Sequence, residues 1–333
     1  MSNMNFSAPV RKAQPTASAV HVDRTLTNMS VAVLQEDGFL GDQVFPILPV
    51  GKQSDLYRVY NRGSMQRDEM RKRAAGTESR TIGYETSTTP YFADVWSLAV
   101  DIDEQTEENA DEEVDLDLEA TMLLAQAARI NRDRQWASTF FSTGVWTGVT
   151  DETLTGNDQW SDYANSDPLG KIEEKLVGVQ EATGFRPNVA VMGPRVWQQL
   201  KNHPDLVDRL NRGQTGGPAQ VMRQNLAELL EMERILVPSA IYNAALEGAT
   251  DDFDFIFGKS VLLLYVAPNV GRYTPTAGVT FAWRGFSGAS AAGTRVKRFE
   301  MPQTSSRRIE IESAYDQKVV APELGAFIAA AVA

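Results

Sequence analysis

The sequence predicts an α+β fold in which helices and strands do not alternate regularly. In the second half of the 333 residues, helical periodicity and short strand-like runs follow one another irregularly, so a doubly wound nucleotide-binding sheet is not expected. The first half holds two blocks of opposite charge. Residues 101–119 contain eleven Asp and Glu and no Lys or Arg, and residues 58–80 contain seven Lys or Arg. Such blocks repel internally and need solvent or a complementary partner.

The composition is that of a globular protein with about two domains. The formal charge of −12 argues against general nucleic-acid binding, which calls for a basic surface. The absence of cysteine excludes disulfides, thiolate metal sites and a cysteine nucleophile. Only two histidines, His21 and His203, are present for acid–base or metal chemistry. No apolar run approaches the ~18–20 residues that span a membrane, and no secretory signal is evident.

The N-terminal third predicts an arm followed by a long two-stranded projection. Residues 1–24 are rich in Ser, Ala, Pro and Gln and predict an extended arm or a disordered terminus. Alternation around residues 55–60 predicts a strand that leaves the body of the protein, and the apolar pattern of residues 91–102 predicts its return. An isolated hairpin of this length is marginally stable in water, so we expect a neighbouring subunit to cover it.

The longest helical signal follows the projection. Apolar residues recur from Val114 to Phe140 at helical spacing, with acidic residues at the start and arginines toward the end. We expect one helix from about 105 to 142, more than ~50 Å long at ~1.5 Å per residue. Residues 144–167 read as an irregular loop.

The remaining chain predicts a mixed domain. The clearest helix has Asp167 as its N-cap, Pro168 in its first turn and Gly184 as its stop. Further helices are expected at about 194–201, 204–211 and 218–232. Strands are expected at 188–192, 234–237, 253–257, 261–267, 278–284, 294–300 and 306–315.

Three segments together resemble the major capsid proteins of tailed bacteriophages, which have the Hong Kong 97-type fold. They are VFPILPVGKQSDLYRVYNRG (residues 44–63), FRPNVAVMGPRVWQQLKNHPDLVDRL (185–210) and IEIESAYDQKVVAPELGAFI (309–328). The order of arm, hairpin, long helix, compact mixed domain and returning strands covers essentially the whole chain. The resemblance is one of pattern and spacing, because no single motif is catalytic or diagnostic.

The resemblance implies a domain plan. It gives an N-terminal arm at 1–40 and an extended hairpin region at 41–103, with the extended loop at about 52–100. A peripheral domain at 104–180 and 295–333 would hold the long helix as its spine, and 181–294 would form an axial domain at the centre of each pentamer and hexamer.

The resemblance also implies a non-enzymatic shell subunit without cofactors. It would assemble in the host cytoplasm into the icosahedral head of a virion and enclose double-stranded DNA without sequence-specific binding. Its partners would be copies of itself, a separate scaffolding protein, a portal and, in some phages, a decoration protein, with no membrane involved.

The charge blocks then acquire a hypothetical role as a subunit interface. The basic loop of one subunit would dock on the acidic start of a neighbour's long helix. The basic residues are Arg58, Arg62, Arg67, Arg71, Lys72, Arg73 and Arg80, and the acidic ones are Asp101, Asp103, Glu104, Glu107, Glu108, Asp111, Glu112 and Glu113. Alternatively, the acidic block on an inner wall would repel packaged DNA and keep it mobile.

Two other functions remain open at the level of sequence. The same fold serves as an encapsulin-like cellular nanocompartment, and an acidic soluble hydrolase would need paired carboxylates in a cleft. Familiar motifs are incomplete: Gly258-Lys259-Ser260 lacks the first glycine of a phosphate-binding loop, and Thr106 replaces the glycine of a calcium loop that would begin at Asp101. Some members of the family cross-link Lys to Asn, but no Asn partner for Lys52 or Lys72 can be identified.

Overall fold

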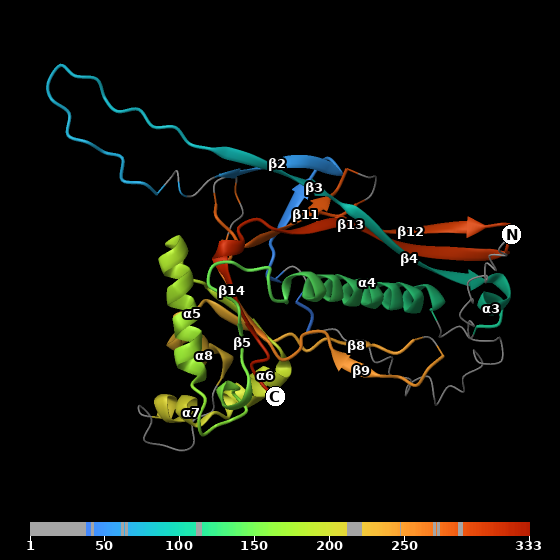
Figure 1. Ribbon diagram of the computed structural model, residues 1–333. Coiled ribbons are helices and arrows are strands. Elements are labelled where there is room, and N and C mark those ends of the chain that lie inside the picture. The colour runs from blue at the N-terminus through green and yellow to red at the C-terminus, as the bar shows by residue number, and fades with distance from the viewer. Residues whose placement is uncertain are drawn as a thin grey trace, which may run out of the picture. The chain divides into compact units, whose positions relative to one another are not determined.

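The computed structural model describes residues 38–40, 43–60, 63, 66–110, 115–211, 222–246, 248–268, 271, 274–285 and 289–333 (Figure 1). The predicted arm therefore lies outside the described residues except for its last three. The chain divides into two compact units. Unit 1 comprises Met1–Gln35, Ser97–Ala128 and Val296–Glu312, and unit 2 comprises Glu36–Trp96, Arg129–Arg295 and Ser313–Ala333.

A sheet that is buried on both faces organises unit 2. Its strand order is β5-β14-β10-β6-β7. The strands are β5 (Glu152–Thr153), β14 (Gly325–Ala329), β10 (Val261–Leu264), β6 (Val189–Met192) and β7 (Arg234–Leu236). Alternate residues of β6 and β10 enter different clusters: Ala190 and Leu263 pack in one, and Val191 and Leu262 in the other. In a sequence, strands buried on both faces are unbroken runs of apolar residues, without alternating polar positions.

Four helices belong to the first of these two sides of the sheet. They are α5 (Pro168–Thr183), α6 (Pro194–Lys201), α7 (Pro204–Asn211) and α8 (Arg223–Leu229). Asp167 caps α5 by accepting a hydrogen bond from the Gly170 amide at 2.9 Å, and Gly184 ends it with a left-handed φ of 81°. The predictions for α5, α6 and α7 are confirmed. The helix predicted at 218–232 is shorter among the described residues.

A second sheet in unit 2 supports the projecting hairpin. Strand β1 (Ile47–Val50) runs parallel to β11 (Gly278–Trp283), which pairs antiparallel with β13 (Ser306–Val319). The hairpin itself is β2 (Ser54–Tyr60) and β3 (Thr86–Phe92). A separate small hairpin joins β8 (Ile241–Asn243) to β9 (Phe253–Phe255).

Unit 1 has its own small core. Strand β13, which continues into this unit, pairs with β12 (Thr294–Met301) and with β4 (Asp94–Asp103). The buried residues come from β4, β13 and α4 (Leu116–Phe140): Ile102, Ile309, Ile311, Ala120 and Leu124. Helix α4 also continues into unit 2, where Trp136 and Phe140 pack with Phe45.

The prediction of one helix from about 105 to 142 is wrong. A short helix, α3 (Glu104–Glu108), ends at Asn109, and α4 begins at Leu116 and ends at Phe140. Carboxylates four residues apart repel along a helix, and a helix continued past α3 would bring Asp111 beside Glu107 and Glu112 beside Glu108. Asp115 starts the second helix, since its Oδ1 accepts the Leu118 amide at 3.0 Å. At ~1.5 Å per residue, α4 is about 37 Å long.

His203 is a buried histidine that holds the start of α7. Its Nε2 lies 3.2 Å from the Ser166 Oγ, and that hydroxyl donates to the Asp162 carbonyl at 2.7 Å. Its Nδ1 lies 3.7 Å from the Asp205 Oδ2, too far for a hydrogen bond. Burial lowers the pKa of His203 below its ordinary value, although Asp205 and Asp167 act in the opposite direction.

We expect acid to destabilise the unassembled chain partly through His203. Because its pKa is lower in the folded state, the unfolded chain takes up a proton first, and the free energy of unfolding falls as pH drops below about 6.5. In His203→Gln that part of the pH dependence should vanish. Urea unfolding at pH 7.5 and 5.5 measures it, and an unchanged pH slope in the variant would contradict this assignment.

Candidate assembly surfaces

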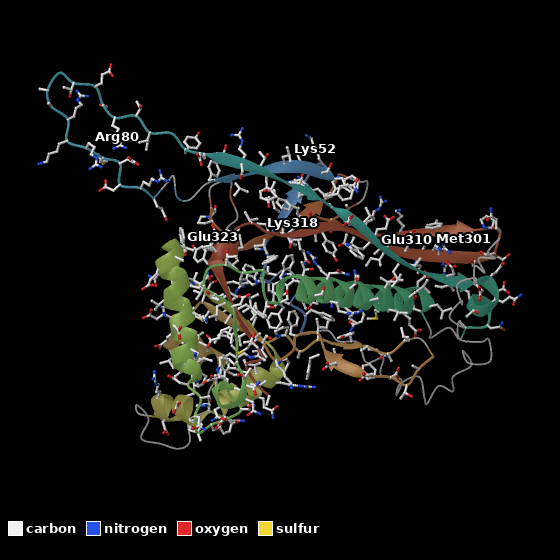
Figure 2. All side chains as sticks on the ribbon, viewed as in Figure 1. Lys52, Arg80, Met301, Glu310, Lys318 and Glu323 are labelled. Carbon is white, nitrogen blue, oxygen red and sulfur yellow. The ribbon has the colours of Figure 1, made fainter. Side chains whose placement is uncertain are left out.

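The loop that joins β2 to β3 projects with little cover from its own chain. Among residues 66–85, large apolar side chains are strongly exposed: Met70 at 90%, Ile82 at 69% and Tyr84 at 69%. Figure 2 shows the side chains of this loop, Arg80 among them, extending away from the ribbon. Within the loop, Arg80 forms an ion pair with Glu69, with 2.5 Å between NH2 and Oε2. Arg73 donates a hydrogen bond to the Ser79 hydroxyl at 2.9 Å. Exposed apolar residues of this size indicate a partner surface.

The base of the loop is firmly attached to the second sheet of unit 2. Tyr91 stacks on Phe281 with ring centroids 4.5 Å apart. Between β3 and β4, Ala93 exchanges two hydrogen bonds with Gln53: the Ala93 amide donates at 2.9 Å and the Gln53 side chain returns one at 3.1 Å. The Phe92 amide donates to the Asp316 carboxylate at 2.9 Å, and burial raises the pKa of Asp316. The loop therefore leaves a rigid base in a defined direction.

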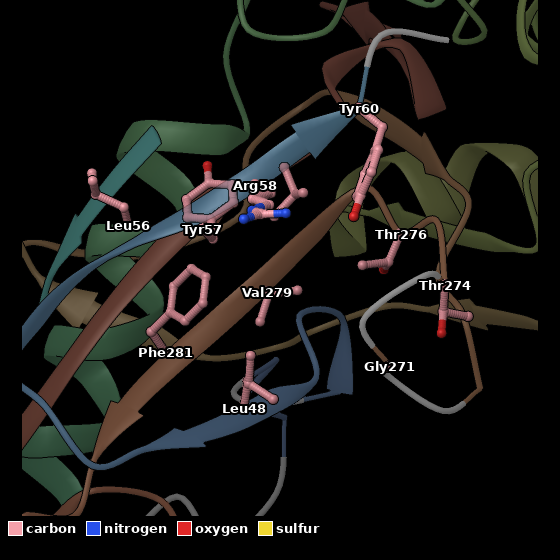
Figure 3. A pocket seen from close by; sticks show the side chains of 11 residues that line it. Leu48, Leu56, Tyr57, Arg58, Tyr60, Gly271, Thr274, Thr276, Val279 and Phe281 are labelled. Carbon is pink, nitrogen blue, oxygen red and sulfur yellow. The ribbon is translucent and has the colours of Figure 1, made fainter. Parts of the chain in front are cut away.

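A cavity of about 530 Å³ lies at this base, between β2 and the sheet (Figure 3). Leu48, Val279, Phe281 and Val320 form its apolar part, together with Leu56 and Tyr57 from β2. Arg58, Tyr60, Thr274 and Thr276 supply its polar groups, and Gly271 completes the lining. Its size lies within the range of ligand pockets, and its lining combines apolar and polar side chains.

The acidic block of unit 1 is partly neutralised by arginines of β12 and β13. Arg308 holds Asp101 with two hydrogen bonds, Nε–Oδ1 at 2.5 Å and NH2–Oδ2 at 2.8 Å. Arg307 bridges Glu107 at 2.7 Å and Asp117 at 2.9 Å. Arg298 also pairs with Asp117. Asp101 raises the pKa of Arg308 through these hydrogen bonds.

The predicted interface residues fall into three groups. Arg62, Asp111, Glu112 and Glu113 lie outside the described residues. Arg67, Arg71, Lys72, Arg73 and Arg80 lie on the projecting loop, whereas Arg58 lines the cavity at its base. Of the acidic residues, Asp101 and Glu107 pair with arginines of their own chain, while Asp103, Glu104 and Glu108 form no ion pair among the described residues.

Sequence reasoning missed Arg298, Arg307 and Arg308 as partners of the acidic block. They lie about two hundred positions further along the chain, and pairing of β13 with β4 brings Arg308 to Asp101. The only signal was that these cations fall on predicted strands.

No helix within the described ranges is long and apolar enough to cross a membrane. The same ranges contain no group of three or more His, Cys, Asp or Glu residues arranged to hold a metal ion.

We expect the Arg308–Asp101 pair to stabilise unit 1 by about 1 kcal/mol, since it is bidentate but half-exposed. Arg308→Met, which keeps the apolar stem, should therefore lower the free energy of unfolding by roughly that amount. A double-mutant cycle with Asp101→Asn, measured by urea unfolding, isolates the pair. Lys201→Met is the control, because Lys201 is exposed and forms no ion pair with the described residues. A coupling energy of zero would show that the Arg308–Asp101 pair does not stabilise the fold.

Comparison with known proteins shows that the chain is similar to phage capsid proteins. The family model described as phage major capsid protein E matches residues 147–236. The major capsid protein of Pseudomonas phage JBD67 is 28% identical over 315 residues, covering 94% of this chain and 97% of the relative. The major capsid protein of Burkholderia phage BcepMu is 24% identical over 269 residues, covering 79% and 84%.

Solved structures share the fold at low identity. A phage-related protein from Bordetella bronchiseptica RB50 has a TM-score of 0.67 at 18% identity, covering 89% of this chain and 93% of that one. The mature capsid of bacteriophage PhiM1 has a TM-score of 0.56 at 14% identity, covering 90% and 89%. The predicted Hong Kong 97-type α+β fold is confirmed.

Proposed function

We propose that this chain, a phage major capsid protein by its relatives and its fold, builds pentamers and hexamers of an icosahedral head around double-stranded DNA. The observation that carries the assembly model is the projecting β2–β3 loop, whose apolar side chains are exposed on a firmly attached base. In an isolated chain, the apolar side chains of this loop stay exposed to water, whereas a neighbouring subunit would cover them. Self-association and presence in the virion follow from the capsid identity.

The domain plan expected from the resemblance remains part of this proposal. Residues 181–294 would form the axial domain, and 104–180 with 295–333 the peripheral domain, with α4 as its spine. The arm, residues 1–40, would reach around neighbouring subunits. Assembly would take place in the host cytoplasm with a scaffolding protein, a portal and, where one exists, a decoration protein, and without enzymatic activity.

The charge blocks supply a specific contact in this proposal. Arg71, Lys72 and Arg73 form a run of three cations on the exposed loop and have no ion pair among the described residues. Asp103, Glu104 and Glu108 are acidic residues of unit 1 that form no ion pair with the described arginines, and they would accept the loop of a neighbour. Each exposed pair contributes only ~0–1 kcal/mol, but symmetry repeats it many times.

We expect charge reversal in the loop to impair assembly. Arg71→Glu with Arg73→Glu should reduce the yield of closed particles and capsomers, because like charges would face each other across the contact. Light scattering and negative-stain electron microscopy at low and high salt measure this, and wild-type assembly should weaken as salt rises.

Two variants control the loop experiment. Lys201→Glu with Arg209→Glu makes the same change in net charge on α6 and α7 and tests for a general charge effect. Adding Glu104→Arg and Glu108→Arg to the loop variant should restore assembly. Normal assembly of the loop variant at low salt would exclude the charged contact.

A cellular nanocompartment is the second candidate. An encapsulin from Synechococcus elongatus PCC 7942 shares the fold with a TM-score of 0.52 at 12% identity, covering 93% of this chain and 95% of that one. The full-length relatives named as phage major capsid proteins favour the phage head. The contents of particles isolated from the natural source distinguish the two: double-stranded DNA supports the head, and enclosed protein cargo supports the nanocompartment.

A further inference from the structure

We infer that the cavity at the base of the loop receives the Met70 side chain of a second copy of this chain, with Arg58 facing Asp68 of that copy. The inference rests on the proposed function, because it names the receptor that the projecting loop finds in the shell. It adds an apolar anchor that the charged contact lacks.

The lining of the cavity suits an apolar side chain that has an acidic residue close to it in the sequence. One part of its wall is apolar, formed by Leu48, Val279 and Phe281 among others, and at about 530 Å³ it is large enough for a methionine side chain and part of its backbone. Among the described residues that line it, Arg58 is the only charged one. Figure 3 shows Arg58 and Tyr60 on β2 across the cavity from Val279 and Thr276. A single cation beside an apolar wall favours an occupant that carries a carboxylate.

The sequence around Met70 has this chemistry. Met70 is 90% exposed, the highest exposure among the large apolar residues of the described chain. Asp68 lies two positions earlier, exposed and without an ion pair within the described ranges. Glu69, between them, is already held by Arg80. Methionine is flexible and fills irregular apolar space well. Ile82 is also exposed, but Thr81 and Gly83 flank it and provide no carboxylate.

The position of the loop favours a second copy over the loop's own cavity. Residues of β2 line the cavity at the root of the hairpin, and the loop runs outward from that root (Figure 1). Donor and acceptor are then different parts of one chain, which makes the contact heterologous. Heterologous contacts close into rings when the rotation between subunits allows it. Arg71, Lys72 and Arg73 follow Met70 directly, so one loop has residues for the cavity of one copy and the acidic surface of another.

Engineered cysteines test the contact directly, because the chain has none of its own. Met70→Cys with Thr274→Cys places one thiol on the loop and one at the rim of the cavity. Mild oxidation of assembled particles should link neighbouring copies into a ladder of dimers and larger species on non-reducing gels, since a disulfide needs Cα atoms within about 7 Å. Each single-cysteine variant should remain monomeric on the same gel.

A matched control uses the turn of the same loop. Thr77→Cys with Thr274→Cys carries the same number of thiols on an equally exposed loop, and its cross-linked fraction should be about tenfold lower if Met70 is the docked residue. Normal particles in which the Met70 pair stays monomeric, or cross-links no faster than the Thr77 pair, would overturn the inference.

A charge exchange tests the same contact without cysteines. Arg58→Asp or Asp68→Arg alone should lower the yield of particles, and the double variant should restore it, because the pair is rebuilt with reversed sign. If the double variant loses as much particle yield as the two single variants together, the contact between Arg58 and Asp68 is contradicted. If the wild-type chain forms no particles even when it is produced together with the other head proteins of its source, the proposed function fails. Normal particles without cross-links or charge rescue reject only this inference.

Discussion

A two-stranded ribbon has no core of its own, and this constraint shapes the β2–β3 projection. At its base, Tyr57 and Tyr91 lie against Phe281 of the supporting sheet, and the Asp316 carboxylate accepts the Phe92 amide. Beyond the base the ribbon loses this support, and Met70 and other apolar side chains stand in solvent. Stability of the projection must then come from another molecule. In the assembly proposed above, that molecule is a second copy of the chain.

The attachment of the base makes the projection useful for assembly. A loop on a mobile root would lose conformational entropy whenever it docked. Here Ala93 and Gln53 exchange hydrogen bonds at the point where β3 passes into β4. The root is therefore ordered before any neighbour arrives, and the cavity beside it is also formed in advance. In the proposed shell, both features would reduce the entropic cost of each contact, which symmetry would repeat many times.

The charges of unit 1 show how long-range pairing changes the interpretation of a sequence block. The acidic run suggested one continuous surface for a partner. Three arginines from β12 and β13 neutralise Asp101, Glu107 and Asp117 within the chain, which leaves a smaller set of acidic residues for a neighbour. The same acidic density also interrupts the predicted helix, because repulsion between successive turns opposes a continuous helix through Asn109.

The sequence by itself determined the α+β class, the helices α5 to α7 and the projection, because local signals suffice for these. Asp167 and Gly184 mark the ends of α5 through hydrogen-bonding and backbone preferences that act within a few residues. The resemblance in residues 44–63, 185–210 and 309–328 also indicated the capsid fold from the sequence alone. Only the tertiary structure decided which acidic residues remain unpaired, that Arg58 stands at a cavity instead of with the loop's other cations, and where α4 begins. Those outcomes depend on strands such as β4 and β13, whose residues lie about two hundred positions apart and meet only when the chain folds.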